Sequence, residues 1–299
     1  MKATTPFLPL LRGQLFGRPP RRVRECLRQE AQQLQRASLG KLTGLFGQYI
    51  PPALLEPTAN GAGSRQRLFC IRTTFWAFLA QVLSPQSSCR EALRKLQAWQ
   101  AACSSEMASS NSSAYCQARG RLPLGLLKQI HERVGLEVNR RSVGDEEFGR
   151  PVKVIDGTSA SMPDTPENQE IWPQTKAQKP GCGFPFVRLV GLFHLGNGVL
   201  IDWAEGSKHN HDAKLFPSLW KHLREGDVLV GDRGFCSYAA MAALFERGVD
   251  TLMRKHQALK LTFRSGRRLG PRDRVICMNK PAQRLGGWTK AAWKKLPRE

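Results

Sequence analysis

The sequence predicts an α/β protein in which an all-helical N-terminal region is followed by a mixed sheet with flanking helices. Two patterns support this. Apolar residues recur at helical spacing over the first 150 residues, whereas short apolar runs of strand length alternate with helical segments between residues 151 and 254. Hydrophobic residues make up 41% of the 299 residues, which is enough for a real core and, at this length, for about two domains.

The N-terminal region, residues 1–150, is predicted to consist of helices. Residues 1–20 contain four prolines and are expected to be irregular. Ser88 is the expected N-cap of one helix, because its hydroxyl can accept a hydrogen bond from a backbone N–H of the first turn. The helices are expected within residues 21–47, 65–83, 87–99 and 114–134.

Strand-like runs begin at Pro151. Asn197-Gly198 indicates a hairpin, so the strands on either side of it should be antiparallel. Helical crossovers follow and favour parallel pairing of the later strands. This is the element order of an RNase H-like core, which we place at residues 151–255, with a basic tail at 256–299. The expected strands are 152–155, 186–195, 199–204, 227–230 and 250–253, and the expected helices are 215–223 and 238–247.

Charge is distributed unevenly along the chain, whose formal net charge is +22. Residues 1–150 hold 22 basic and 10 acidic side chains, a net charge of +12. Residues 151–251 hold 10 basic and 12 acidic side chains, a net charge of −2. Residues 252–299 hold 14 basic and 2 acidic side chains, a net charge of +12. Such basic flanks attract polyanions, of which nucleic acid is the commonest, although a solvated basic face or a loose tail is the alternative. An acidic solvating protein is excluded.

Cysteine spacing and hydropathy argue against other classes. The eight cysteines form no C-x-x-C pair and no zinc-finger spacing, so we expect reduced, structural thiols. The longest apolar stretch, residues 68–83, is interrupted by Arg72 and Gln81 and is too short and too polar to span a bilayer. The N-terminus lacks the apolar run of a secretory signal. A cytoplasmic protein without a membrane segment is therefore expected.

Two aspartates follow apolar strands. Asp156 comes directly after residues 152–155, and Asp232 follows Gly231 at the end of the fourth strand. In the predicted sheet these strand ends are neighbours, so the two carboxylates could bind Mg²⁺ or Mn²⁺ together. Paired ions can activate a water or a 3′-hydroxyl for phosphodiester chemistry. Each motif alone is weak evidence, since Asp-Gly after a strand is most often only a turn.

Several stretches of the chain resemble the insertion-sequence transposases of the IS-four type. The resemblance covers roughly residues 65–299, and several of the stretches are long enough to be specific. They are Tyr115-Cys116-Gln117-Ala118-Arg119, Val154-Ile155-Asp156-Gly157-Thr158, Ser161-Met162-Pro163-Asp164-Thr165-Pro166-Glu167-Asn168, Gln178-Lys179-Pro180-Gly181-Cys182-Gly183-Phe184-Pro185, Arg188-Leu189-Val190-Gly191-Leu192-Phe193, Gly231-Asp232-Arg233-Gly234-Phe235-Cys236-Ser237-Tyr238, and the tail from Arg267-Arg268-Leu269-Gly270 through Trp288 to Leu296-Pro297.

The resemblance implies a DDE enzyme. In this family an RNase H-like domain uses three acidic residues to hold divalent metal, cut DNA at transposon ends and join those ends to a target. Asp156 matches the first acid and Asp232 the second, which implies catalytic and metal-binding roles for both. The implied partners are the double-stranded DNA of transposon ends and of the target. The implied location is the nucleoid, and a homodimer on DNA fits the family, although the sequence does not fix the oligomeric state.

The chain departs from the family at the third acid. The family places a glutamate in a pattern of Tyr, two residues, Arg, three residues, Glu, six residues and Lys, which does not occur in residues 1–299. Glu299 lacks the upstream Tyr and Arg, and Glu246 is only a remote substitute. We therefore expect a C-terminally truncated transposase that binds DNA and is inactive, or nearly so, in cleavage and strand transfer, because such sites depend on accurate positioning.

Two other functions stay open. One is a non-catalytic DNA-binding protein derived from a transposase, and the other is a basic RNA-binding protein with no catalytic site. The arginine-rich residues 264–274, together with Trp288 and Trp293, either grip DNA through phosphates and base stacking or are a remnant without its partner domain. The arginines of the helical region are expected to contact the DNA backbone. His209-Asn210-His211 is expected to cap the next helix, with Asn210 or Asp212 as the acceptor.

Overall fold

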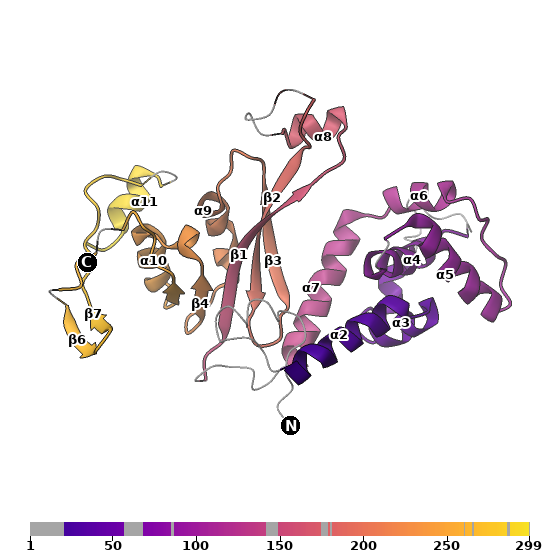
Figure 1. Ribbon diagram of the computed structural model, residues 1–299, viewed down its shortest axis with the longest axis horizontal. Helices are drawn as coiled ribbons and strands as arrows, with labels where there is room; N and C mark the ends of the chain where they lie inside the picture. Colours follow the sequence, from indigo (N-terminus) through magenta and orange to yellow (C-terminus); the bar gives the residue numbers. More distant parts are fainter. Residues whose placement is uncertain are drawn as a thin grey trace. The chain divides into compact units, whose positions relative to one another are not determined.

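The computed structural model describes residues 21–56, 68–84, 87–141, 149–174, 179, 181–259, 261–264, 266–285 and 288–298. These residues form two compact units, one of residues 21–141 and one of residues 149–298 (Figure 1). The first unit is helical, and the second combines a sheet with short helices. The expected domain boundaries near residues 150 and 255 stay predictions. No helix in the described ranges is long and apolar enough to cross a membrane.

The helical unit has more breaks than the periodicity predicted. Ser38 takes an extended conformation, and its hydroxyl accepts a hydrogen bond from the Lys41 amide at 3.2 Å, so the helix expected over 21–47 becomes two. Ser88 caps its helix as predicted, accepting from the Glu91 amide at 3.1 Å. The elements are α2 (Arg21–Arg36), α3 (Leu39–Phe46), the 3-10 helix η1 (Pro52–Leu55), α4 (Ile71–Leu83), α5 (Cys89–Ala102), α6 (Ser113–Gly120) and α7 (Leu124–Arg141).

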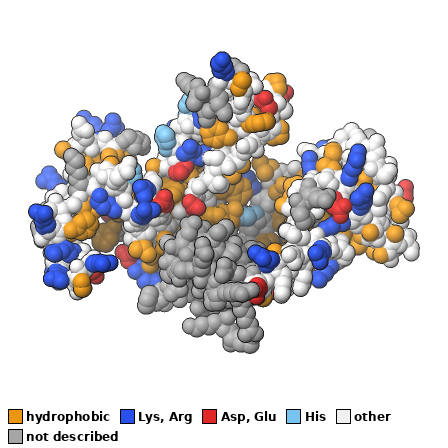
Figure 2. Space-filling model, viewed as in Figure 1, with side chains coloured by type: hydrophobic (Ala, Val, Ile, Leu, Met, Phe, Trp, Pro, Cys, Tyr) orange, Lys and Arg blue, Asp and Glu red, His pale blue; other side chains and the backbone are white. Residues whose placement is uncertain are grey.

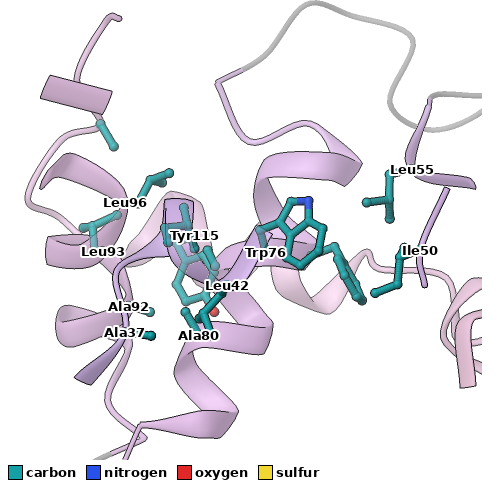
Figure 3. Packing of buried hydrophobic residues seen from close by; sticks show 14 of the residues in the cluster. Ala37, Leu42, Ile50, Leu55, Trp76, Ala80, Ala92, Leu93, Leu96 and Tyr115 are labelled. Atoms are coloured by element: carbon teal, nitrogen blue, oxygen red, sulfur yellow. The ribbon is translucent and has the colours of Figure 1, made fainter. Parts of the chain in front are cut away.

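One apolar core holds these helices together. Leu42 of α3, Leu96 of α5 and Tyr115 of α6 are fully buried. Figure 3 shows Leu42 and Tyr115 beside Ala80 of α4, with Trp76 one turn further along. The alanine leaves room for the larger side chains of the neighbouring helices, and α3, α5 and α6 all pack on α4.

The second unit is built on a five-stranded mixed sheet of order β3-β2-β1-β4-β5. The β1–β2 and β2–β3 pairs are antiparallel, and the β1–β4 and β4–β5 pairs are parallel. This arrangement, with helices on the sheet, confirms the predicted RNase H-like class. The strands are β1 (Val152–Ser161), β2 (Phe186–His194), β3 (Leu200–Gly206), β4 (Val228–Gly231) and β5 (Asp250–Met253).

Short helices cover one face of this sheet. Ile155 of β1 and Leu229 of β4 point into a core shared with Leu219 and Leu244 from two of these helices. The segment expected as one helix over 215–223 is an α-helical turn followed by a 3-10 helix. The elements are α9 (Asp212–Leu215), η2 (Phe216–His222), η3 (Arg233–Phe235) and α10 (Tyr238–Phe245), while α8 (Pro166–Ile171) lies in the connection between β1 and β2.

The Asn197-Gly198 hairpin between β2 and β3 is confirmed, with Gly198 at a φ of +72° that suits a glycine. The tail adds a small hairpin of β6 (Arg267–Gly270) and β7 (Asp273–Val275), then α11 (Lys290–Lys295). Trp288 packs against Trp220 of η2, with ring centroids 6.1 Å apart. Its ring therefore contributes to the packing of the sheet unit. The sequence had instead suggested that this ring stacks on DNA bases.

Candidate active site

Asp156 and Asp232 follow the last residue pair of the parallel β1–β4 ladder. That ladder ends where Ile155 lies opposite Gly231, so the next residue on each strand is an aspartate. Adjacent strands lie about 4.8 Å apart, which makes the two residues neighbours across the strands. Asp156 was expected at the end of the first strand. Instead β1 continues to Ser161, pairing with β2 beyond the point where β4 stops (Figure 1).

The register also places both aspartates on one face of the sheet. Successive side chains of a strand point to opposite faces, so Asp156 shares the face of Val154 and Asp232 shares that of Val230. Val154 and Val230 are paired in the ladder. The carboxylates therefore point to the same side, away from the face that Ile155 shares with η2 and α10.

Glycines next to each aspartate allow close packing on the opposite face. A Cβ on Gly231 would lie 2.8 Å from Cγ2 of the buried Ile155. A Cβ on Gly157 would lie 2.7 Å from Oδ2 of Asp212. Gly157 therefore packs against the first residue of α9, and Gly231 packs against β1. Both glycines lie within strands, so neither Asp-Gly nor Gly-Asp forms a β-turn.

The surroundings of the two carboxylates leave oxygen atoms open to a ligand. Both side chains are exposed. Oδ1 of Asp156 accepts a hydrogen bond from the Gly157 amide at 2.8 Å, so Oδ2 is the oxygen available to a ligand. Asp232 begins η3 without a side-chain capping bond, and no described residue forms an ion pair with it. Within the described part of the chain, no group of three or more His, Cys, Asp or Glu residues is placed to hold a metal ion.

Asp212 lies close to β1 and could be mistaken for a third ligand. Its carboxylate forms an ion pair with Nη1 of Arg188 at 3.2 Å and lies over Gly157. By strand alternation this is the face opposite to the Asp156 side chain. The capping role expected for Asp212 or Asn210 is wrong, because His211 is the N-cap of α9 and makes no side-chain capping bond.

Glu246 lies away from the two aspartates. Glu246 follows α10 at its C-cap, close to the turn where the Gly226 amide bonds to the Gly248 carbonyl. Because β4 and β5 are parallel and Val228 pairs with Asp250, this is the end of the sheet away from Asp232. Glu299 lies outside the described residues.

A buried ion pair joins β1 to the residue before β4, a few residues from the two aspartates. Lys153 and Asp227 are 8% and 3% exposed, and Lys153 Nζ lies 2.5 Å from Asp227 Oδ2. The same ammonium donates to the His222 carbonyl at 2.7 Å, and the Arg224 amide donates to the Asp227 carboxylate at 2.7 Å. Three segments, β1, the end of η2 and the start of β4, are thereby fixed together. The sequence reasoning missed this pair, although a lysine inside an apolar strand run was a signal for it.

A second cluster ties η2 to the edge strand β3. Asp202 Oδ2 lies 2.6 Å from Nε2 of His222 and 3.1 Å from Nζ of Lys221, and Oδ1 accepts from the Trp203 amide at 2.8 Å. Burial alone would raise the pKa of Asp202, but the bonds from His222, Trp203 and Lys221 outweigh it and lower that pKa.

We expect Asp202→Asn to destabilise the protein at neutral pH and to have less effect in acid. An aspartate with a lowered pKa stabilises the fold above its unfolded pKa of about 3.9, and this contribution is lost as the pH falls through its folded pKa. The expected loss is about 1–2 kcal/mol at pH 7, shrinking below about pH 4, by denaturant unfolding. Glu205→Gln, at an exposed carboxylate of the same strand, is the control; an Asp202→Asn effect equal at both pH values would contradict the assignment.

Comparison with protein families shows where this unit belongs. Residues 147–295 match the family model described as "Transposase DDE domain". Residues 147–295 therefore belong to the transposase DDE domain family, and the curated relatives support the IS-four type. The match covers the whole five-stranded sheet, both aspartates and the tail up to α11.

Two curated relatives support the same family. The chain is 23% identical over 262 residues to "Transposase InsG for insertion sequence element IS4" of Escherichia coli (strain K12), which covers 83% of this chain and 56% of the relative. It is 26% identical over 141 residues to "Putative transposase InsZ" of the same strain, covering 46% of each chain. The chain thus spans about half the length of the curated relatives that it matches.

Proposed function

We propose that this chain is part of a transposase that binds double-stranded DNA, at transposon ends and at the target, and that it holds Mg²⁺ or Mn²⁺ between Asp156 and Asp232. The observation that carries the proposal is the β1–β4 register, which ends at Ile155 and Gly231 and makes the two aspartates neighbours on one face. Membership of the DDE transposase family supports the same roles for these residues.

The oxygen atoms available at this place suit a hard divalent cation. Asp232 offers a carboxylate without a bond to any described side chain, and Asp156 offers Oδ2. Magnesium is commonly held by one or two carboxylates and completes its octahedral shell with water. A bound cation would activate the attacking water or 3′-hydroxyl and neutralise charge on the scissile phosphate. The residues of this chain would hold the cation and direct it to one face of the sheet.

Arginines beside the carboxylates fit a phosphate backbone. Arg233 follows Asp232 directly, and the Arg254 amide donates to the Gly231 carbonyl at 3.4 Å, which puts Arg254 at the same sheet edge. Neither forms an ion pair within the described ranges, so both can neutralise phosphates. Figure 2 shows further Lys and Arg side chains over the β6–β7 hairpin and α11, and others over the helical unit. We propose backbone contacts to DNA for these surfaces and, on that basis, a nucleoid-associated protein that assembles as a dimer on DNA.

We further propose that these 299 residues, tested alone, cleave DNA little or not at all. They carry two of the three acids of the family pattern, and the described residues hold no third carboxylate beside the pair. With only two carboxylates, a bound cation has few protein ligands and is poorly positioned. Metal-dependent sites of this kind lose most of their cleavage rate when the cation is misplaced.

Cation binding is the first test of the proposal. We expect Mn²⁺ titrated into the protein, followed by electron paramagnetic resonance of the free ion, to show one site per chain. Asp156→Ala and Asp232→Ala should each weaken it at least tenfold, on the order of the loss expected for removing a principal ligand. Asp164→Ala, at an exposed aspartate of the same unit, is the matched control. Equal affinity in all four proteins would rule out the site.

DNA binding and cleavage are measured separately. A fluorescent duplex should bind with an affinity that falls steeply with salt and should stay intact with Mg²⁺ or Mn²⁺. Cleavage that disappears in Asp156→Ala would overturn the proposed inactivity and support the metal site. DNA binding without any Mn²⁺ site would favour a non-catalytic DNA-binding protein, and equal affinity for RNA and DNA would favour a basic RNA-binding protein.

A further inference from the structure

Two cysteines of the helical unit lie in contact across different helices. Cys89 is the first residue of α5, and Cys116 is in the middle of α6. Their sulfur atoms are 3.5 Å apart, with the Cys116 thiol placed to donate to Cys89. Both side chains are partly exposed, so a small reagent can reach them. This pairing was not expected from the sequence, in which the two cysteines are far apart.

Several donors converge on the sulfur of Cys89. Besides the Cys116 thiol, Nε2 of Gln81 lies 3.5 Å and Nη1 of Arg119 lies 3.6 Å from it. The α5 N-terminus, capped by Ser88, adds the positive end of a helix dipole. A guanidinium and a helix N-terminus are the surroundings that favour negative charge on a cysteine sulfur and make it nucleophilic.

Buried hydrogen bonds hold these donors in place. Oε1 of Gln81 accepts from the Tyr115 hydroxyl at 2.6 Å and from Nη1 of Arg119 at 3.1 Å. Burial raises the pKa of Tyr115 well above its usual range, so the hydroxyl keeps the proton that it donates. The hydrogen bond to Cys89, followed by burial, raises the pKa of Cys116, so this thiol keeps its proton while Cys89 is the acceptor. The two sulfurs therefore have different roles.

The other described cysteines lack such a partner. Four of them are exposed, at Cys26, Cys103, Cys182 and Cys277. Cys70 contacts the Thr73 hydroxyl at 3.4 Å, and Cys236 is buried. Cys103 follows the last residue of α5 and serves as an internal comparison for exposure without donors.

We propose that Cys89 and Cys116 form an oxidisable dithiol that reacts with a small hydroperoxide and closes to a disulfide between α5 and α6. The site is independent of the aspartate pair and of the function proposed for it. Arg119 is a positioning residue that favours attack by Cys89, and Cys116 is the resolving thiol.

The disulfide forms in two steps, through a sulfenic acid on Cys89. The Cys89 thiolate attacks one peroxide oxygen, the O–O bond breaks, and the leaving hydroxide takes up a proton to give water and a sulfenic acid. The Cys116 sulfur then attacks the Cys89 sulfur, an S–S bond forms, the S–O bond breaks, and the hydroxide leaves as water with the Cys116 proton. Two thiols and one hydrogen peroxide thus give one disulfide and two waters, with two electrons passing from sulfur to oxygen.

The movement required is small. A disulfide bond is about 2.05 Å long, so the sulfurs must approach each other by about 1.5 Å. Side-chain rotation and a slight shift of α6 toward α5 can supply this. The bond would join α5 to α6 next to Gln81 and restrict the movement of these two helices relative to each other.

Peptide mapping of the unmodified protein is the primary test and needs no variant. The protein is treated with a few equivalents of hydrogen peroxide, blocked with N-ethylmaleimide and digested for mass spectrometry. We expect a Cys89–Cys116 linked peptide as the main oxidised species, removed by dithiothreitol, while Cys103 carries the blocking group. Oxidation of Cys103 as fast as Cys89, or no linked peptide, overturns the proposal.

Variants then assign the roles. Cys116→Ser should leave a sulfenic acid on Cys89 that dimedone traps, and Cys89→Ser should slow oxidation of Cys116 at least tenfold. Arg119→Met should slow disulfide formation about tenfold, with partial recovery in Arg119→Lys, while Cys103→Ser should change nothing. Circular dichroism confirms that each variant is folded. Equal rates in Arg119→Met and the unmodified protein would refute the role of Arg119.

Discussion

Replacing Asp227 by alanine is expected to lower the free energy of unfolding of the sheet unit by about 3–5 kcal/mol. The change leaves the Lys153 ammonium buried without its counter-charge, and the Arg224 amide without its acceptor. Hydrogen exchange of the β1 and β4 peptides measures the loss where the pair lies. Because Lys153 is three residues before Asp156, the same variant should also weaken Mn²⁺ binding.

The neighbouring Arg150–Asp250 pair provides the matched control. Its Nη1 to Oδ2 distance is 2.6 Å, but both side chains are more than one-third exposed, so Asp250→Ala should cost at most about 1 kcal/mol. The double variant Lys153→Met with Asp227→Leu should recover much of the loss, because it removes both charges from the interior. Equal effects of Asp227→Ala and Asp250→Ala would show that the buried pair contributes no more than a surface pair.

Gln81→Leu is expected to lower the free energy of unfolding of the helical unit by about 2–4 kcal/mol, although leucine is the more apolar residue. The change leaves the fully buried Tyr115 hydroxyl and the Ser87 carbonyl without their partner. Each buried polar group left unpaired costs about 1–3 kcal/mol. Thermal and denaturant unfolding monitored by circular dichroism near 222 nm would measure the loss, with the helical unit contributing most of the signal.

Gln97→Leu is the comparison for this prediction. Gln97 is on α5, and its Nε2 donates to the Ala108 carbonyl at 2.8 Å, so the loss of this bond should cost about 1 kcal/mol. Tyr115→Phe should cost a similar amount, since Gln81 keeps Arg119 as a donor. If Gln81→Leu costs no more than Gln97→Leu, the hydrogen bonds around Gln81 do not act together.

The parts of the fold that local patterns determine were predictable. Apolar runs located all five strands of the sheet, and Asn197-Gly198 located the hairpin, because side-chain alternation and turn geometry act over a few residues. The ends of elements were less accurate. The extension of β1 beyond Asp156 depends on pairing with β2, and the break at Ser38 depends on one capping hydroxyl that competes with helix periodicity.

The candidate site was predictable in position but not in detail. Two strand ends and a parallel crossover suffice to bring Asp156 and Asp232 together. The contact of Asp212 with Gly157 and the Lys153–Asp227 pair join residues more than fifty positions apart, which no local pattern encodes. The Cys89–Cys116 contact is of the same kind, since it depends on how α5 and α6 pack. These tertiary contacts required the structure.

The pairing of β1 with β4 also bears on the order of folding. The β2–β3 hairpin joins strands that are close in the chain, whereas the segment from Ser161 to Val228 must close as a long loop before β1 and β4 can meet. Non-local parallel pairing forms slowly because the entropy of loop closure is lost before the contacts are gained. We therefore expect Asp156 and Asp232 to become neighbours late in folding, so that during synthesis on the ribosome the chain carries its basic surfaces before the proposed metal site has formed.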